Sequence, residues 1–197
     1  MSKSKDLEQR LARTEQQLRL FQRISRLMVS ESSLQQVLNS IVKLVQEFTA
    51  CDSCLVYLLE DRQLVLCASN TAANGALDEV RLNLNEGLTG WVARERRLLA
   101  ISREAYNDSR FKTFAELEAD TFEAFLSAPV MARSKVVGVI NVQHREPHAY
   151  TGDEMELLTT VGEQVGCLLM LARLDRETME RSLSLGTVLA GTAAVRG

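Results

Sequence analysis

The sequence is poor in the residues that most often carry out chemistry. Its 197 residues include two histidines, two prolines, four cysteines and one tryptophan, and aromatic residues make up 5%. No apolar run reaches the ~18 residues that cross a bilayer, and the polar first ten residues are not followed by an apolar segment. The sequence therefore predicts no membrane span and no signal peptide, and we expect a cytoplasmic protein.

Motifs of common catalytic and nucleotide-binding sites are also missing. No serine lies in a G-x-S-x-G turn, and the GLTG segment at 87–90 lacks the lysine and the spacing of a phosphate loop. His144 and His148 have Pro147 between them and lie far along the chain from the nearest cysteine pair. We expect exposed loop histidines following a strand, and no zinc site.

The cysteines do not follow the pattern of a redox centre. Cys54 enters a predicted strand, whereas reactive pairs begin helices. We expect Cys51 and Cys54 to be small, partly buried side chains on opposite faces, and Cys67 and Cys167 to be core residues. The sequence thus predicts no catalytic residue, no cofactor and no metal.

Charge gives no general attraction for nucleic acid. The net charge is −3, although residues 1–30 carry seven Lys or Arg against three acids. These cations alternate with apolar positions and have no aromatic stacking partners nearby, so they predict a solvated helix face. We expect neither a nucleic-acid partner nor a membrane partner.

Two apolar stripes predict a helix over the first 30 residues. The main stripe has heptad spacing, and a second stripe, Leu20, Ile24 and Leu27, begins beside it. The helix should therefore need a partner on one face at its start and on two faces near its end. The heptad positions are Leu7, Leu11, Thr14, Leu18, Phe21, Ser25 and Met28.

Two further helices have start signals. Ser32 or Ser33, with a glutamine three residues later, predicts a capping box before an amphipathic helix that should lie on a sheet. Thr151 and Glu154 predict a second capping box before a long closing helix. The apolar pattern is lost after Leu174.

The middle of the chain is rich in short β-forming runs. Tight connections at 61–62 and 133–135 predict antiparallel hairpins, and short helices are expected at 88–95 and 111–120. The fold class is α+β, with helices stacked on one sheet. We predict a heptad helix for dimerisation and signalling over 1–31, one domain over 32–174, and a linker or the start of a further domain over 175–197. The β-forming runs are 54–60, 63–70, 79–84, 98–104, 125–133 and 135–146.

Four stretches in order resemble a GAF domain: CDSCLVYLLE, LNEGLTGWVARERRLLAI, NDSRFK and the segment 124–158. The resemblance implies a PAS-related antiparallel sheet of about six strands flanked by helices. It also implies a ligand pocket near residues 88–120 and dimers through the terminal helices. The strings look most like the GAF domain that precedes the catalytic part of nitrogen-related phosphoenolpyruvate-protein phosphotransferases, although transcription regulators carry similar ones.

Departures from the family's patterns argue against its specialised members. Free methionine sulfoxide reductases have a cysteine where Thr89 stands, and bilin-binding photoreceptors have a cysteine near 106–120, where this chain has none. His144-Arg145 replaces the Asn-Lys pair of cyclic-nucleotide-binding GAF domains.

Candidate ligand-binding residues come from strand alternation and from the NDSRF segment. Ser127, Asn141 and Gln143 should face one space, although Asn141 could instead bond loop backbone. Arg110 could bind a ligand carboxylate or act as a structural clamp with Asp108. The aromatic candidates could line a pocket or fill the core. The full set is Thr89, Trp91, Tyr106, Asp108, Arg110, Phe111, Phe114, Phe125, Ser127, Asn141 and Gln143.

The sequence thus predicts a non-catalytic sensory GAF module. We expect a homodimer that binds a small metabolite, such as an amino acid, and relays the signal through helices to an output domain, such as that of a phosphoenolpyruvate-protein phosphotransferase. The alternatives are a redox-active enzyme of the free methionine sulfoxide reductase kind and a dimerisation module without a ligand.

Overall fold

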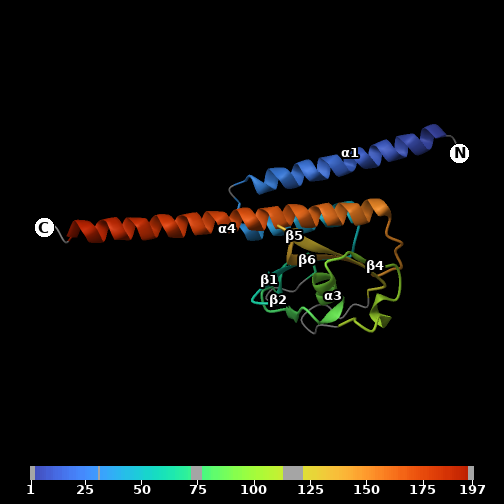
Figure 1. Cartoon of the computed structure of the whole chain (residues 1–197). Coiled ribbons are helices and arrows are strands. Elements are labelled where there is room, and N and C mark those ends of the chain that lie inside the picture. Colours follow the sequence, from blue (N-terminus) through green and yellow to red (C-terminus); the bar gives the residue numbers. More distant parts are fainter. Residues whose placement is uncertain (1–2, 31, 72–76, 113–121, 195–197) are drawn as a thin grey trace.

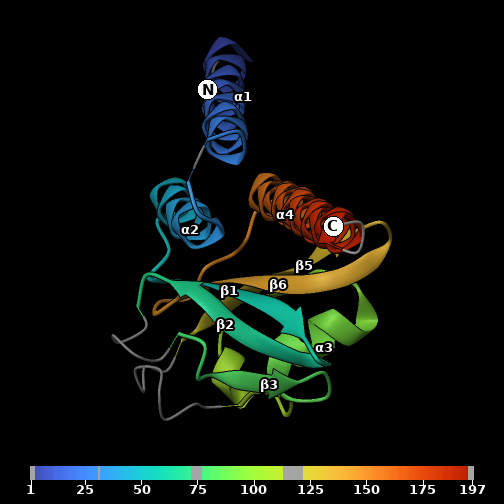
Figure 2. The ribbon, with the colours of Figure 1, turned by 90° about the vertical axis from the view of Figure 1, so that its left-hand side faces the viewer.

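The computed structural model describes residues 3–30, 32–71, 77–112 and 122–194, without the side chains of 3–6, 9–10 and 175–194. The predicted α+β class is confirmed. Six antiparallel strands form one sheet, in the spatial order β3-β2-β1-β6-β5-β4. Figure 1 shows the two long helices along one side of the sheet, and Figure 2 shows α1, α2 and α4 on one face with α3 on the other. The strands are β1 (Ser53–Glu60), β2 (Gln63–Ser69), β3 (Arg81–Asn83), β4 (Leu99–Ile101), β5 (Ala124–Ala132) and β6 (Lys135–His144).

Two tight turns fix the register of the sheet, as predicted. Asp61 and Arg62 join β1 to β2 with φ angles of 44° and 69°, and Arg133 and Ser134 join β5 to β6 with φ angles of 47° and 62°. Two successive left-handed residues match the right-handed twist of the paired strands. The register places Ser127 opposite Asn141.

Capping boxes start α2 (Leu34–Thr49) and α4 (Gly152–Ala194), and both predictions are confirmed. At α2, Ser33 Oγ accepts a hydrogen bond from Gln36 N while the Gln36 side chain accepts one from Ser33 N. At α4, Glu154 N donates to Thr151 Oγ1 and Thr151 N donates to Glu154 Oε2. Each box satisfies two backbone donors that the first turn leaves unpaired.

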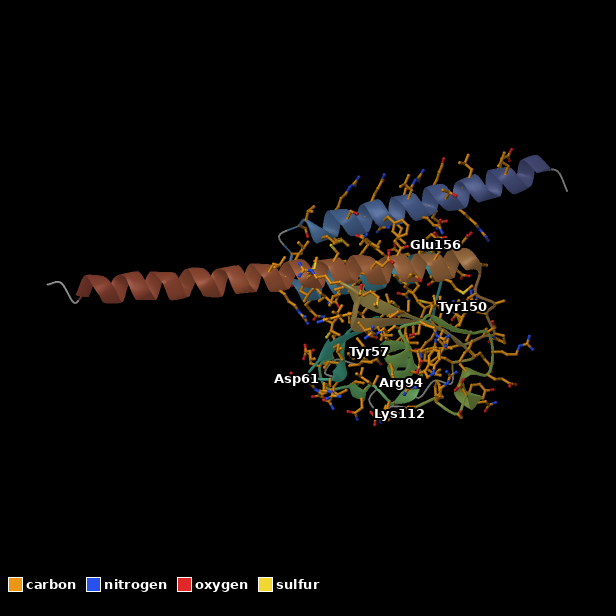
Figure 3. All side chains as sticks on the ribbon, in the orientation of Figure 1. Tyr57, Asp61, Arg94, Lys112, Tyr150 and Glu156 are labelled. Atoms are coloured by element: carbon orange, nitrogen blue, oxygen red, sulfur yellow. The ribbon has the colours of Figure 1, made fainter. Side chains whose placement is uncertain are left out.

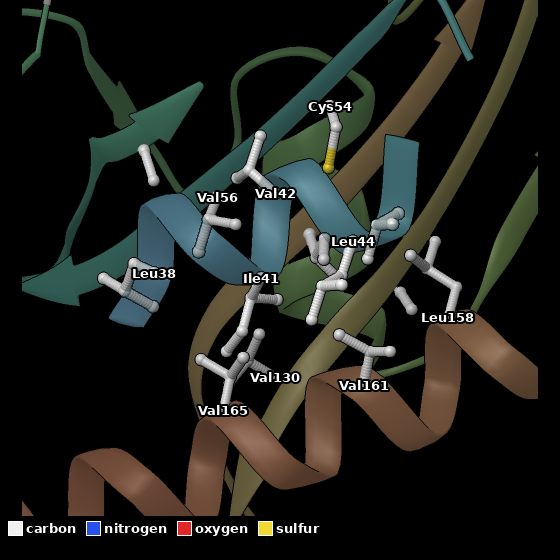
Figure 4. Close-up of a cluster of buried hydrophobic side chains, with 14 of the residues drawn as sticks. Leu38, Ile41, Val42, Leu44, Cys54, Val56, Val130, Leu158, Val161 and Val165 are labelled. Atoms are coloured by element: carbon white, nitrogen blue, oxygen red, sulfur yellow. The ribbon is translucent and has the colours of Figure 1, made fainter. Parts of the chain in front are cut away.

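The main core lies between the sheet and the helices α2 and α4. Figure 4 shows Ile41 of α2, Val130 of β5 and Val165 of α4 converging in this layer. A second cluster, which includes Tyr57 and Val92, fills the space between the sheet and α3 (Gly87–Glu95). The sheet is therefore covered on both faces, and polar side chains on the α3 face are buried.

The first helix, α1 (Lys3–Met28), packs one of its two apolar stripes against the domain and exposes the other to solvent. Leu20 and Ile24 of the second stripe are buried against the main core, whereas Leu7, Leu11 and Leu18 of the heptad stripe are 67%, 59% and 57% exposed. The predicted second face near the end of the helix is thus confirmed. The heptad face has no cover from the described part of this chain at these three leucines.

Helix α4 continues beyond the amphipathic pattern. It does not end at Leu174 but extends to Ala194 as one helix, because no proline interrupts residues 175–194. Whether residues 175–197 are a linker or the start of another domain stays a prediction. By length and composition the part Gly152–Leu174 could cross a membrane, but 44% of the apolar window within it is buried in the domain, as in a core helix.

Two glycines let α4 lie directly on β5. A Cβ on Gly162 would stand 3.0 Å from Pro129 O, and one on Gly166 would overlap Met131 O. The predicted packing role of these glycines is confirmed.

Two expectations for the cysteines are wrong. Cys51 and Cys54 lie fully buried in the same core cluster instead of on opposite faces, because Cys51 precedes β1 and does not follow the strand's alternation. Cys167 is exposed on α4 instead of buried, while Cys67 is a core residue as expected.

Candidate functional site

The start of α3 is built by a turn that the sequence indicates. Gly87 has a φ angle of 66°, in the left-handed region that favours glycine, and Asn83 N donates to Glu86 Oε2 over 2.9 Å. A Cβ on Gly90 would lie 2.7 Å from Asn83 O, so only glycine allows α3 to approach the end of β3 this closely. This close approach places Thr89 over the sheet.

Three buried side chains connect α3 to the neighbouring strands β5 and β6. Ser127 Oγ of β5 donates to Asn141 Oδ1 of β6 over 2.7 Å, and Asn141 Nδ2 donates to Thr89 Oγ1 over 2.8 Å. Their exposed fractions are 0%, 1% and 7%. We call this the polar chain Ser127–Asn141–Thr89. The predicted shared face of Ser127 and Asn141 is confirmed, but the backbone alternative for Asn141 is wrong, because its partners are side chains from other elements.

The next polar residue on this face is Gln143. It is 8% exposed and lies opposite Ser53 of β1 and Phe125 of β5. Within the described ranges, the amide of Gln143 has no hydrogen-bond partner, whereas Ser53 Oγ shares a hydrogen bond of 3.1 Å with Thr71 Oγ1. No fully buried side-chain N or O atom of the described residues lacks a hydrogen-bond partner, so the polar atoms of this amide reach the surface at the edge of the site.

A charged cluster lies at the outer side of α3. Arg110 donates to both carboxylate oxygens of Asp108, through Nε over 2.8 Å and through an Nη atom over 2.6 Å, and its guanidinium lies 4.7 Å from the Trp91 ring centre. The hydrogen bonds from Arg110 lower the pKa of the Asp108 carboxyl, and the same pair raises the pKa of Arg110. Of the two interpretations of Arg110, the geometry matches the clamp, since its guanidinium is paired with Asp108.

The remaining candidates lie around this cluster. Phe125 is buried with Leu88, and Phe111 packs against the same small group. Tyr106 is half-buried in the short 3-10 turn Ala105–Asn107, where the charge of Glu123 raises its pKa. Phe114, and the predicted helix at 111–120 apart from its first two residues, lie outside the described residues.

The expectation of exposed loop histidines is wrong for His144, whereas His148 lies in the loop after β6 as predicted but is half-buried. His144 is the last residue of β6, is 7% exposed, and stacks on His148 with ring centres 4.1 Å apart. Its Nδ1 lies 3.1 Å from the Tyr150 hydroxyl, and His148 Nε2 lies 2.7 Å from Glu154 Oε1. Burial, and then the charge of His148, lower the pKa of His144. Within the described ranges, no group of three or more His, Cys, Asp or Glu side chains could hold a metal ion.

Two features of the site and its surroundings were not predicted from the sequence. Arg97, distant from Arg110 in the chain, also lies over the Trp91 ring, at 5.5 Å. Three grooves of about 370, 260 and 250 Å³ that the described residues line all lie on the face of α1, α2 and α4, not under α3. Only the Arg-rich segment 94–97 could have indicated cations near Trp91.

The α3 side of the sheet is suited to recognition. Its central side chains are neutral hydrogen-bonding groups or apolar groups, and charges lie on its rim at Asp108 and Arg110. Figure 3 shows two further rim residues, Arg94 and Lys112, on the side of the sheet remote from α1 and α4. Such a mixture is typical of small-molecule sites, which fix a ligand with a few convergent polar groups.

Solved structures of similar fold include GAF domains of phosphotransferases and a methionine sulfoxide reductase. The GAF domain of a phosphoenolpyruvate-protein phosphotransferase from Coxiella burnetii superposes with a TM-score of 0.76 and 21% identity, over 83% of this chain and 98% of that one. The corresponding Acinetobacter domain gives a TM-score of 0.72 and 28% identity, over 82% and 97%. A free methionine-R-sulfoxide reductase from Neisseria meningitidis, solved with its substrate, gives 0.64 and 12%, over 77% and 87%.

Family comparison agrees with the fold. No curated protein sequence matches this chain. The family model described as GAF domain matches residues 31–170, from the segment before α2 into α4, and this range contains the whole sheet and the polar chain Ser127–Asn141–Thr89. With this match over most of its length and with the sheet and helix arrangement of the solved GAF domains, the chain belongs to the GAF domain family.

Proposed function

We propose that this chain is a non-catalytic sensory module that binds a small metabolite on the α3 side of its sheet. The observation that carries the proposal is the polar chain Ser127–Asn141–Thr89. Its members are each at most 7% exposed, and they link α3 to the neighbouring strands β5 and β6. A ligand that exchanges hydrogen bonds with this chain changes how α3 is held on the sheet. The likeness to GAF domains of phosphoenolpyruvate-protein phosphotransferases favours an amino acid or a related metabolite as the ligand.

The thiols argue for sensing over reductase chemistry. Burial raises the pKa of Cys51 and Cys54, and burial with nearby carboxylates raises the pKa of Cys67 to about 11. Thiols in this state are protonated at neutral pH and are poor nucleophiles. The hydroxyl of Thr89 accepts a hydrogen bond from Asn141, and by the resemblance of the GLTG segment Thr89 stands where the reductases carry a cysteine.

The proposed relay of the signal runs through α4. This helix contacts the strand that carries Ser127, because Gly162 and Gly166 bring its backbone against Pro129 O and Met131 O of β5. A ligand with different affinity for two arrangements of β5 and α4 would shift the balance between them. The proposed receiver is an output domain in the same cytoplasmic protein, such as that of a phosphoenolpyruvate-protein phosphotransferase.

We also propose that two copies of this chain associate. The leucines of α1 at positions 7, 11 and 18 are more than half exposed, and a heptad face of this kind is stable in water when another helix covers it. We therefore expect a homodimer, measured as twice the chain mass by light scattering after size-exclusion chromatography.

A thermal screen tests ligand binding. Amino acids and related metabolites are added to the wild-type protein, to Thr89→Val and to the matched control Thr160→Val. The Thr160 hydroxyl donates to Glu156 O within α4, on the other face of the sheet from Thr89 (Figure 2). We expect one metabolite class to raise the melting temperature of wild type and control, and to raise that of Thr89→Val less. If no metabolite shifts the wild type, sensing is wrong and a dimerisation module without a ligand is favoured.

The enzyme alternative has its own assay. Turnover of free methionine sulfoxide with a thiol reductant is measured for wild type and for a Cys51→Ser, Cys54→Ser, Cys67→Ser triple variant. Activity that the triple variant loses would overturn the non-catalytic assignment.

A further inference from the structure

A basic groove lies where α4 passes the β5–β6 hairpin. Val137, Leu169 and Met170 form its apolar floor, and Arg133, Lys135 and Arg173 stand around it. Its volume is about 260 Å³, and no carboxylate is found among the described residues that line it. We call this recess the hairpin groove.

The size of the hairpin groove indicates what it can accept. Pockets for small ligands usually have volumes of about 300–1,000 Å³, so the groove is below that range. Its three cations are exposed at its edge, while its floor is apolar. The matching occupant is an apolar side chain flanked by a carboxylate, presented by a protein segment.

The heptad face of α1 has this chemistry. Leu11 and Leu18 are 59% and 57% exposed, and Glu15 lies four residues after the first and three before the second, on one flank of the stripe. Glu15 pairs with Arg19 over 3.9 Å, but both side chains are more than half exposed. Exposed pairs of this kind contribute little, so Glu15 can change partner at low cost.

The α1 helix of the same chain does not reach the hairpin groove. The two helices run in the same direction (Figure 1), and Arg13 and Gln17 contact Asp153 near the start of α4. Leu169 lies sixteen residues, or about 24 Å, further along α4, whereas α1 continues for only about 17 Å beyond Gln17 before it ends at Met28. The heptad leucines lie still further from the groove.

We infer that the hairpin groove binds the Leu11–Leu18 face of α1 from a second copy of this chain, with Glu15 facing Arg133. If the copies are related by a two-fold axis that crosses α4 near Gly162, the start of each α4 lies level with about residue 171 of the other. The same contact then forms twice, since each copy offers both surfaces. This inference rests on the proposed homodimer and adds which surfaces form it.

Charge reversal with rescue tests this contact. The dissociation constant of the dimer is measured by analytical ultracentrifugation for wild type, Arg133→Glu, Glu15→Arg and the combination of both. The matched control is Arg62→Glu, because Arg62 occupies the equivalent left-handed turn of the β1–β2 hairpin, with a φ angle of 69°.

We expect each single reversal at the contact to weaken the dimer about tenfold or more, since like charges then meet twice, and the combination to restore much of the loss. Arg62→Glu should leave the constant unchanged. A monomeric wild type overturns the homodimer itself. A dimeric wild type in which Arg133→Glu has no more effect than Arg62→Glu, or in which Glu15→Arg does not rescue it, overturns the contact and leaves the homodimer standing.

Discussion

Replacement of Gly166 by alanine tests how closely α4 packs on β5. The new methyl group would overlap Met131 O, a backbone atom held in the β5–β6 ladder. Unlike the end of a flexible side chain, this carbonyl cannot rotate away. The helix must therefore move off the strand or the strand must deform.

The magnitude follows from two opposed effects. Overpacking of a core costs about 1–3 kcal/mol, whereas alanine is favoured over glycine inside a helix by about 1 kcal/mol. Because the overlapping atom is a backbone carbonyl, the cost should lie at the upper end of this range, and we expect a net loss of about 2 kcal/mol in the free energy of unfolding for Gly166→Ala. Gly162→Ala should lose less, because its Cβ would stand 3.0 Å from Pro129 O.

Gly152 provides the control within the same helix. It is the first residue of α4, and nothing lies within 4 Å of the Cβ that alanine would add. We expect Gly152→Ala to be neutral or slightly stabilising. Urea unfolding followed by Trp91 fluorescence gives the three free energies, and the order Gly166, Gly162, Gly152 should hold from most to least destabilised. Equal stability of Gly166→Ala and Gly152→Ala would refute the close approach of α4 to β5.

Three further predictions concern the polar chain, the histidine stack and the thiols. Asn141→Leu leaves the Ser127 and Thr89 hydroxyls buried without their partner, so the free energy of unfolding in urea should fall by about 2–3 kcal/mol. The triple variant that adds Ser127→Ala and Thr89→Val should recover much of this loss. A triple variant no more stable than Asn141→Leu would contradict the role of the polar chain. Because burial and the charge of His148 lower the folded pKa of His144, its contribution to stability is complete above the unfolded value of about 6.5 and is lost as the pH falls toward the folded value. Between pH 7 and 5 the melting temperature of the wild type should therefore fall more than that of His144→Asn. Equal falls in the two melting temperatures would contradict this role of His144. The groups that face His144 are His148, Tyr150, Asp52, Glu154 and the Thr49 carbonyl. A thiol reagent should modify one cysteine of the native chain rapidly, Cys167, and all four after unfolding, because the other three are buried; fast reaction of a second thiol in the native chain would be inconsistent with the fold.

Local patterns in the sequence predict most of the fold. The capping boxes at Ser33 and Thr151 depend on residues three apart, and the hairpin at Asp61–Arg62 depends on two turn residues between β-forming runs. Each of these signals involves only a few neighbouring residues, so it can be recognised without knowing the rest of the fold. The shared face of Ser127 and Asn141 follows in the same way, from strand alternation and a two-residue turn.

Errors occur where the outcome depends on neighbours that are distant in the sequence. Cys167 is on an amphipathic helix but faces outward, and His144 follows the pattern of a strand end but is covered by the rings of His148 and Tyr150. The helical pattern of α4 fades after Leu174 because no sheet lies beneath the helix to require an apolar face (Figure 1). A periodic pattern indicates burial, and its loss does not end a helix.

Periodicity and motifs of a few residues were enough to predict the α+β class, the capping boxes, the hairpin turns and the family, because each of these depends on residues close together in the chain. The partners of Asn141, the clamping of Arg110 by Asp108 and Trp91, and the stripe of α1 that stays uncovered became known from the three-dimensional packing alone. The physical reason is that a buried hydrogen bond needs both partners within about 3 Å. That distance is set by the packing of α3 and α1 on the sheet and not by the spacing of residues along the chain.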